Sequence, residues 1–271
     1  MMMTTPPYPP FTAPVAIVTG GSSGIGLATV ELFLQNGVSV AFCGRDEVRL
    51  CQAEADLRIR YPQATLFAMP CDVLNEAEVK HFAAQSERVL GAASMLVNNA
   101  GQGRVSTFAS TDDTAWTQEL HLKFFSLIYP IRAFLPQLES RAGEGSIVCV
   151  NSLLAAQPEP HMVATSAARA GIKNLVRSMA TEFAPKGVRV NGILLGLVES
   201  GQWTRRFEAR EDKTQDWPTW MGELAARKHI PLARLGRPQE AAQAIYFLAT
   251  PLSSYTTGSH IDVSGGLSHH A

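Results

Sequence analysis

A glycine-rich stretch is the first part of the sequence that could do chemistry. It is Thr19-Gly20-Gly21-Ser22-Ser23-Gly24-Ile25-Gly26, directly after an apolar, β-branched run and just before a helical pattern. Glycines at 20, 24 and 26 would let the backbone turn tightly and approach a pyrophosphate, whose charge the first N–H groups of the following helix would stabilise. Because the stretch lies between a strand and a helix, we predict a nucleotide-binding loop rather than an ordinary turn.

Arg45, at the end of the second apolar run, bears on which nucleotide binds. It follows Gly26 by about 20 positions, where an NAD site commonly has a carboxylate that binds the ribose hydroxyls. A guanidinium can instead hold a 2′-phosphate through several donors. We expect the adjacent Asp46 to cap the next helix, and the alternative for Arg45 is a solvated loop charge. The sequence therefore predicts NADP(H) in preference to NAD(H).

Short β-branched runs alternate with longer helical patterns from Val15 onward. The expected strands are Val15–Thr19, Val38–Cys43, Thr65–Met69, Ser94–Val97, Ser146–Asn151, Val188–Leu194 and Ser259–Val263. The expected helices are Ile25–Gln35, Asp46–Arg58, Glu76–Val89, Thr114–Leu138, Ala164–Phe183 and Pro238–Ala249. Repeated β-α-β units require a parallel sheet with helices on both faces. The prediction is a single doubly wound α/β domain of three α/β/α layers, with its ligand at the carboxyl ends of the strands.

The segment from about Val198 to Arg237 interrupts this alternation. It is charged, has no clear strand, and contains four large aromatic residues, Trp203, Phe207, Trp217 and Trp220. Long connections of this kind in a compact domain are usually functional, often as lids. We therefore expect residues 198–237 to form a substrate lid, the alternative being a surface excursion with a short helix.

Composition restricts the classes of function. The chain has 271 residues, 46% of them hydrophobic and 17% charged, with a formal net charge of −1. This composition supports a packed core and excludes wholesale disorder. It provides no polybasic surface for nucleic acid or anionic membranes, and no apolar run approaches the roughly 20 residues of a membrane helix. We expect neither a nucleic-acid nor a membrane partner.

Cysteine use and the N-terminus indicate the compartment. The four cysteines are scattered and form no C-x-x-C pair: Cys43, Cys51, Cys71 and Cys149. Disulfides and zinc or redox motifs are therefore not expected, and His269-His270 lacks a third ligand, so no metal is predicted. Residues 1–14 are Pro-rich without the basic-then-apolar order of a signal peptide. We expect a disordered leader over 1–14, the folded domain over 15–271, and a cytoplasmic location.

Further motifs accompany the glycine-rich loop in a characteristic order and spacing. They are Asp72-Val73, Asn98-Asn99-Ala100-Gly101, Ser152, Arg189-Val190-Asn191, the stretch 231–240, Thr257-Gly258 and Gly265-Gly266. With them, the chain from about Val15 to Gly266 resembles the short-chain dehydrogenase/reductase family. The resemblance implies a Rossmann-like seven-stranded parallel sheet and a nicotinamide cofactor. It also implies hydride transfer to or from a small carbonyl or alcohol substrate, and usually a homotetramer, with a homodimer as the alternative.

The resemblance also assigns cofactor contacts by position. It implies Asp72 and Val73 against the adenine, the 99–101 run along the ribose, and residues 196–200 beside the nicotinamide carboxamide. The complete predicted cofactor set is Thr19, Gly20, Ser22, Ser23, Gly24, Ile25, Gly26, Arg45, Asp72, Val73, Asn99, Ala100, Gly101, Arg169, Gly196, Val198 and Ser200.

The catalytic positions depart from the family pattern of Asn, Ser, Tyr and Lys. Ser152 is present, but Thr165 replaces the tyrosine, Arg169 the lysine and Lys123 the asparagine. A threonine hydroxyl is a much weaker acid than a phenol, whose pKa is about 10. Arginine keeps its proton near neutral pH. The tyrosine's usual role therefore cannot pass directly to Thr165 or to Arg169.

Lys123 is the remaining proton source among the replaced positions. Its ordinary pKa of about 10.4 would fall beside Arg169 and in a partly buried site, toward the range useful for acid catalysis. We predict Lys123 as general acid/base, Ser152 as the group that polarises the substrate oxygen, Thr165 as an orienting or water-relaying group, and Arg169 as the residue that positions the cofactor. The alternative for Lys123 is a solvated charge on a helix face.

Two other functions remain open at the level of sequence. A catalytically silent NADP(H)-binding protein, acting as a sensor or scaffold, would also keep the cofactor motifs while losing the tyrosine. An acyl hydrolase using Ser152 and Lys123 is the weaker alternative, because no nucleophile elbow or oxyanion hole is visible. An NADP(H)-dependent oxidoreductase with a non-standard proton donor is the favoured interpretation.

Overall fold

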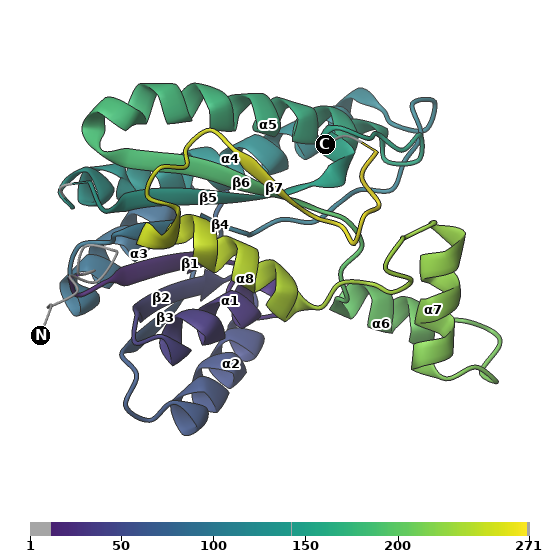
Figure 1. The fold of residues 1–271 in the computed structure, drawn as a ribbon, viewed down its shortest axis with the longest axis horizontal. Coiled ribbons are helices and arrows are strands. Elements are labelled where there is room, and N and C mark those ends of the chain that lie inside the picture. The colour runs from purple at the N-terminus through teal and green to yellow at the C-terminus, as the bar shows by residue number, and fades with distance from the viewer. Residues whose placement is uncertain (1–11, 142, 270–271) are drawn as a thin grey trace, which may run out of the picture.

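Seven parallel strands form one sheet at the centre of the molecule, between two layers of helices (Figure 1). The computed structural model describes residues 12–141 and 143–269, so most of the predicted leader lies outside the described residues. The strand order is β3-β2-β1-β4-β5-β6-β7. The order reverses between β1 and β4, and the carboxyl ends of these strands border the crevice where ligands of such sheets bind. The predicted doubly wound α/β architecture is confirmed.

The strands are β1 Val15–Thr19, β2 Ser39–Gly44, β3 Leu66–Pro70, β4 Met95–Asn98, β5 Gly145–Ser152, β6 Val188–Leu195 and β7 His260–Val263. The helices are α1 Gly24–Gln35, α2 Glu47–Arg60, α3 Glu76–Leu90, α4 Asp113–Glu139, α5 Val163–Phe183, α6 Gly201–Glu208, α7 Trp217–Arg227 and α8 Pro238–Ala249. Each of the predicted strands and helices is present, with its ends shifted by at most about two residues.

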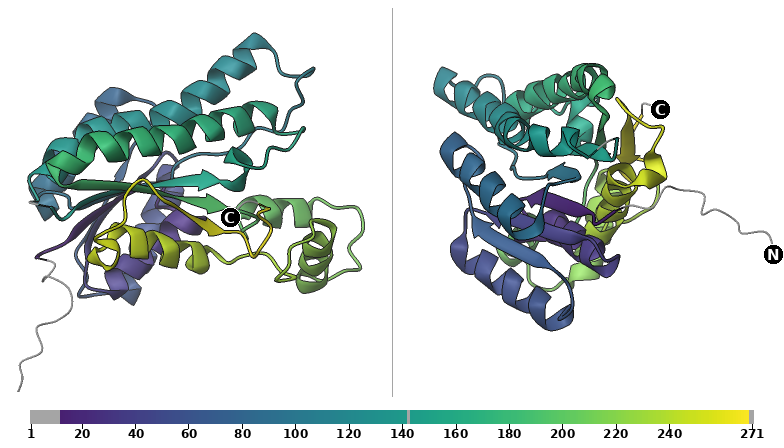
Figure 2. Two further views of the ribbon diagram at one scale, coloured as in Figure 1. Left: turned by 45° about the horizontal axis from the view of Figure 1, so that its top comes forward. Right: turned by 90° about the vertical axis from the view of Figure 1, so that its left-hand side faces the viewer.

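Different helices cover the two faces of the sheet, as both views of Figure 2 show. Side chains alternate along a strand, so Val15 and Ile17 of β1 join the core beneath α3, α4 and α5. Ala16 and Val18 join the core beneath α1, α2 and α8. These two layers bury both faces, which explains why the strands are continuous apolar runs rather than alternating ones.

Aspartate and asparagine caps begin several of the helices. Asp46 accepts a hydrogen bond from the backbone N–H of Arg49 at 3.0 Å, so its predicted role as the cap of α2 is confirmed. Asp112 caps α4 in the same way, through the N–H of Ala115 at 2.7 Å. The cap of α4 matters for the site because that helix carries Lys123.

Helices α4 and α5 approach closely at one point. A Cβ on Gly171 of α5 would lie 2.6 Å from Cζ of Phe124 on α4, so the phenyl ring occupies the space that a side chain there would need. The contact brings the neighbouring turns of the two helices together. Lys123 and Arg169 lie on those turns.

Residues 198–237 contain two helices, α6 and α7, rather than one short helix. In Figure 1 they project beyond the carboxyl edge of the sheet. Four aromatic rings pack against one another with centroids 5.1–6.3 Å apart: Trp203, Phe207, Trp217 and Trp220. This small separate core also takes in Leu224, Ile230 and Leu235. In the described part of the chain, no helix combines the length and apolarity needed to cross a membrane.

Candidate active site

The loop between β1 and α1 has the backbone shape that a pyrophosphate site needs. Gly20 and Gly24 have φ values of +67° and +54°, in the left-handed region that disfavours a side chain. A Cβ on Gly26 would lie 2.1 Å from the carbonyl oxygen of Gly20. The N-cap Ser23 makes no side-chain bond to α1, and the first turn of α1 has no acidic residue. The N–H groups of that turn are therefore available to an anion.

Side chains at the ends of β1 and β4 hold this loop in place. The Thr19 hydroxyl accepts the backbone N–H groups of Asn99 at 3.0 Å and Ala100 at 3.1 Å. The Asn99 side chain donates in turn to the carbonyls of Thr19 and Gly20, both at 3.1 Å. A Cβ added to Gly101 would meet open space. The predicted loop residues and the 99–101 run thus meet at the crevice between β1 and β4.

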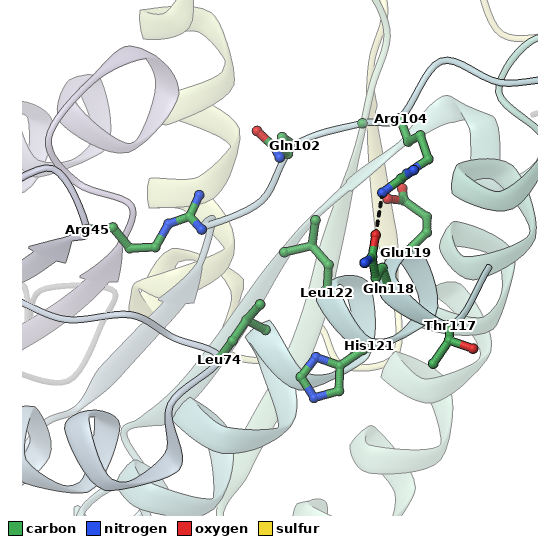
Figure 3. Close-up of a pocket in the computed structure, with 10 residues that line it drawn as sticks. Arg45, Leu74, Gln102, Arg104, Thr117, Gln118, Glu119, His121 and Leu122 are labelled. Atoms are coloured by element: carbon green, nitrogen blue, oxygen red, sulfur yellow. Dashed lines mark hydrogen bonds between the residues drawn. The ribbon is translucent and has the colours of Figure 1, made fainter. Parts of the chain in front are cut away.

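Arg45 borders a cavity of about 580 Å³ at the carboxyl edge of the sheet. Figure 3 shows Arg45 on one side of it, Gln102 above, and Arg104, Gln118 and Glu119 on the far side. The neighbouring Asp46 carboxylate is taken up by its own helix, through the Arg49 N–H and a 3.0 Å ion pair with the Arg49 guanidinium. In the described chain the exposed Arg45 side chain has no protein partner, so its guanidinium is available to a phosphate.

The other predicted cofactor residues surround the same edge. Val73 is buried, and Asp72 Oδ1 accepts the N–H of Leu74 at 3.0 Å, in the turn after β3. Gly196 continues β6 through an N–H bond to Val263. Val198 pairs with Gly236 across the base of the 198–237 segment. Residues that complete the set lie in the loop or at a helix start: Ser22, Ile25 and Ser200.

Lys123 is buried in α4, where its side chain is 2% exposed. Its ammonium donates to Oε1 of Glu119 at 2.7 Å and to the backbone carbonyl of Gln102. The Thr165 hydroxyl, from α5, donates to the same Glu119 oxygen and accepts the N–H of Arg104 at 3.0 Å. One carboxylate oxygen therefore binds a side chain from α4 and one from α5, and both of these side chains also bind the loop that follows β4.

Ser152 ends β5, and the side chain of Arg169, from α5, reaches the same strand end. Arg169 donates to the carbonyl of Val150 at 2.9 Å, while its buried Nε has no partner among the described residues. The Ser152 hydroxyl accepts the N–H of Leu154 at 3.2 Å and lies 3.4 Å from the carbonyl of Leu195. Among the described residues, the hydrogen bonds of Ser152 and those of Lys123 do not join the two side chains directly.

Burial and charge set the protonation of the two cations. Removal from water lowers the pKa of Lys123, and the positive charges of Arg169 and Arg104 lower it further, while Glu119 raises it. Burial also lowers the pKa of Arg169 to about 10, so its guanidinium stays charged at neutral pH. Lys123 is thus an ammonium that gives up its proton more readily than an exposed lysine does.

Glu119 is a site residue that no motif in the sequence indicates. The available signal was its spacing, since a glutamate four residues before a lysine lies on the same helix face and can pair with it. Such pairs are common on exposed helices and of little consequence there. Only the burial of both side chains, 3% and 2% exposed, distinguishes this pair.

Comparison with known proteins decides the family. A model of the group described as enoyl-(acyl carrier protein) reductase matches residues 20–268. An uncharacterized short-chain type dehydrogenase/reductase of Sinorhizobium fredii is 31% identical over 94% of this chain and 97% of its own length. The chain belongs to the short-chain dehydrogenase/reductase family. Its seven-stranded sheet and crevice are accounted for by that membership.

Two solved structures are similar to this chain over nearly its whole length. A short chain oxidoreductase from Pseudomonas aeruginosa PAO1, described as containing an atypical catalytic center and solved with NADPH bound, is 72% identical, with a TM-score of 0.92 over 95% of this chain and 98% of that one. L-Sorbose reductase from Gluconobacter frateurii, solved with NADPH and L-sorbose, is 29% identical, with a TM-score of 0.89 over 96% and 98%.

Proposed function

We propose that this short-chain dehydrogenase/reductase is an NADP(H)-dependent oxidoreductase that reduces a carbonyl, or oxidises the corresponding alcohol, with Lys123 as its proton donor. The observation that carries the proposal is the Lys123 ammonium. Two of its N–H groups are bound, and a third has no partner in the described chain. Its two partners, Glu119 and Gln102, line a cavity that extends to Arg45. The kinship with NADPH-bound oxidoreductases supports the choice of cofactor.

The residues present fit a dinucleotide of this kind. The loop from Gly20 to Gly26 would hold the pyrophosphate, and Arg45 a 2′-phosphate. The unpartnered Nε of Arg169 is a donor that a ribose hydroxyl would satisfy. When bound, the reduced nicotinamide supplies the hydride.

Proton delivery is assigned to the chain's own residues. Lys123 protonates the substrate oxygen as the carbon–oxygen double bond is reduced, and the neutral amine that remains regains a proton from water. Ser152 donates to the same oxygen and polarises it. Thr165 acts as an orienting group and not as the acid, because its own proton is directed to Glu119. In the oxidative direction Lys123 accepts the proton instead.

Measuring hydride transfer is the direct test of the proposed oxidoreductase activity. Aldehydes, ketones and alcohols, with sugars and sugar alcohols included, are incubated with the protein and NADPH or NADP, and the absorbance of the reduced nicotinamide is followed. We expect turnover with at least one member of the panel. Tight binding of NADPH without turnover across the panel would instead support the silent, cofactor-binding alternative.

Replacing Arg45 by alanine should weaken NADPH binding but leave NADH binding nearly unchanged. Hydrogen bonds to a charged group contribute about 1.5–3 kcal/mol, which corresponds to a rise of roughly 10- to 100-fold in the Kd of NADPH. Nicotinamide fluorescence measures both constants. Arg49→Ala, which removes a neighbouring exposed guanidinium, is the control. If wild type binds both cofactors equally and neither value changes in the variant, Arg45 does not select the cofactor.

We also propose that residues 198–237 act as a lid over the substrate. The two ends of the segment are tied together, since Glu199 N–H donates to the Gly236 carbonyl at 2.8 Å. Directly after α7, Lys228 binds both carboxylate oxygens of Glu159 at 3.1 Å, and Glu159 also contacts His161. These contacts link the lid to the loop before α5.

Lys228→Ala should loosen that link and raise the KM of the substrate with little change in kcat. Half-exposed ion pairs contribute less than about 1 kcal/mol, so the expected increase is about two- to fivefold. Steady-state kinetics with saturating NADPH measures it, with Lys213→Ala at the exposed tip as control. A fall in kcat at constant KM would assign the contact to chemistry rather than to closure.

The proposed quaternary state follows from the family resemblance, and the proposed compartment follows from the scattered cysteines and the N-terminal sequence. We propose a homotetramer, with a homodimer as the alternative, in the cytoplasm. Exposed apolar side chains on α4 and near the C-terminal helix support an association of subunits: Leu120, Phe247, Leu252 and Tyr255. The substrate is expected to be a small molecule.

A further inference from the structure

Glu119 is the centre of the polar cluster, and the proton transfer proposed for Lys123 does not itself use it. Its Oε1 atom accepts from the Lys123 ammonium at 2.7 Å and from the Thr165 hydroxyl. The side chain is 3% exposed. A buried carboxylate is costly unless it is paired and hydrogen-bonded, and here both partners are residues that occupy altered catalytic positions. A purely structural role would not require these partners.

We propose that Glu119 is a positioning residue that holds the Lys123 ammonium in place and keeps it charged for proton delivery. This inference rests on the proposed function. Lys123 has a long and flexible side chain, and holding it in one conformation costs entropy. The Glu119 carboxylate and the Gln102 carbonyl fix two of the three N–H directions, which leaves the third for the substrate oxygen.

The surroundings of Lys123 explain why a carboxylate is needed. The charged groups that face its ammonium are Glu119 on α4, Arg104 from the loop after β4, and Arg169 on α5. Both arginines disfavour the charged form, as does burial, and Glu119 is the one group of the three that favours it. Without the carboxylate, Lys123 would lose its proton at a lower pH, and the reduction would lack its acid over part of the neutral range.

Thr165 completes the arrangement. Its hydroxyl accepts the backbone N–H of Arg104 and donates to Glu119, so it anchors the same carboxylate oxygen that Lys123 binds. The position where the family has a tyrosine acid therefore carries a group that supports the acid on another helix. This accounts for the joint change of Lys123 and Thr165.

Glu119→Gln keeps the shape of the side chain and removes its charge, and is the principal test. We expect kcat of carbonyl reduction to fall by about tenfold or more at neutral pH, and its decline at alkaline pH to move to lower pH. The Kd of NADPH should stay within about twofold, because Glu119 is not assigned to the cofactor. Glu119→Asp keeps the charge and should recover part of the pH profile.

The matched control is Glu76→Gln on α3. Glu76 pairs with Lys80 at the same four-residue spacing, at 2.8 Å, but both side chains are about half exposed or more. This variant should leave kcat and its pH profile unchanged. An unchanged pH profile in Glu119→Gln would overturn the proposal, as would an equal loss in Glu119→Asp and Glu119→Gln.

A second measurement does not depend on turnover. The Nζ resonance of Lys123 is titrated by NMR in protein labelled with ¹⁵N-lysine, and Lys123→Met assigns it. We expect the titration to move to lower pH in Glu119→Gln, and an unmoved titration would contradict the role of Glu119. If wild type transfers no hydride to any substrate, the proposed function fails, while this titration still decides the assignment of Glu119.

Discussion

Lys123→Met is expected to abolish measurable turnover and to destabilise the protein. General acids contribute about 10²- to 10⁴-fold to rate, and methionine fills a similar volume without a proton to donate. The same change leaves the Glu119 carboxylate buried without its cation, and breaking a buried pair in this way costs about 3–5 kcal/mol of unfolding free energy. Steady-state kinetics and urea unfolding measure the two losses.

Two variants separate the effects of Lys123→Met. Lys80→Met breaks the exposed pair with Glu76 and should change neither rate nor stability appreciably. Thr165→Val keeps both buried charges and should reduce turnover without abolishing it. If Thr165→Val were the more damaging of the two site variants, proton delivery would have to be reassigned to α5.

The pH dependence of wild type follows from the lowered pKa of Lys123. In reduction the ammonium form is required, so the rate is highest below that pKa and falls as pH rises through it. In oxidation the neutral amine is required, and the rate rises over the same interval. An ordinary exposed lysine would shift both changes to higher pH.

Gly26→Ala is expected to abolish cofactor binding. The added Cβ would lie 2.1 Å from the Gly20 carbonyl oxygen and 2.5 Å from Nδ2 of Asn99, and neither group can move without displacing the loop that is tied to Thr19. We expect the Kd of NADPH to rise by more than about 100-fold, a loss of at least roughly 2.7 kcal/mol. Calorimetric titration with NADPH measures this loss.

Gly222→Ala is the control for Gly26→Ala. A Cβ at Gly222, in helix α7, meets no atom within 4 Å, and alanine favours a helix more than glycine does. This variant should bind NADPH as wild type does and should be no less stable. Retention of wild-type affinity in Gly26→Ala would show that the loop does not approach the cofactor as closely as proposed.

The order of elements was predictable because each one carries its own local signal. β-Branched runs such as Val15–Thr19 are buried on both faces and give nearly uniform apolar segments. The helix patterns between them show the period of an amphipathic helix. The two helices of 198–237 were harder to predict, because α6 is mostly polar and its few apolar residues pack on α7 rather than on the sheet.

The site was predictable only in part, and the reason is physical. Positions 123, 165 and 169 follow from the register of the family, and the structure brings them together. Glu119 has no motif, because a carboxylate four residues before a lysine is usually exposed on a solvated helix surface. Its importance depends on burial by a loop and a helix that are distant in sequence, which no local pattern records.

The ring of Phe124 seated over Gly171 has a further implication for how such enzymes diversify. The ring fixes the position of α4 relative to α5, because a shift of α4 along α5 would bring the ring into contact with the backbone of α5. Substitutions can therefore change the reactive side chains on either helix while the relative position of the two helices stays the same. A change from a tyrosine acid on α5 to a lysine acid on α4 would then require new side chains but no change in the packing of the two helices.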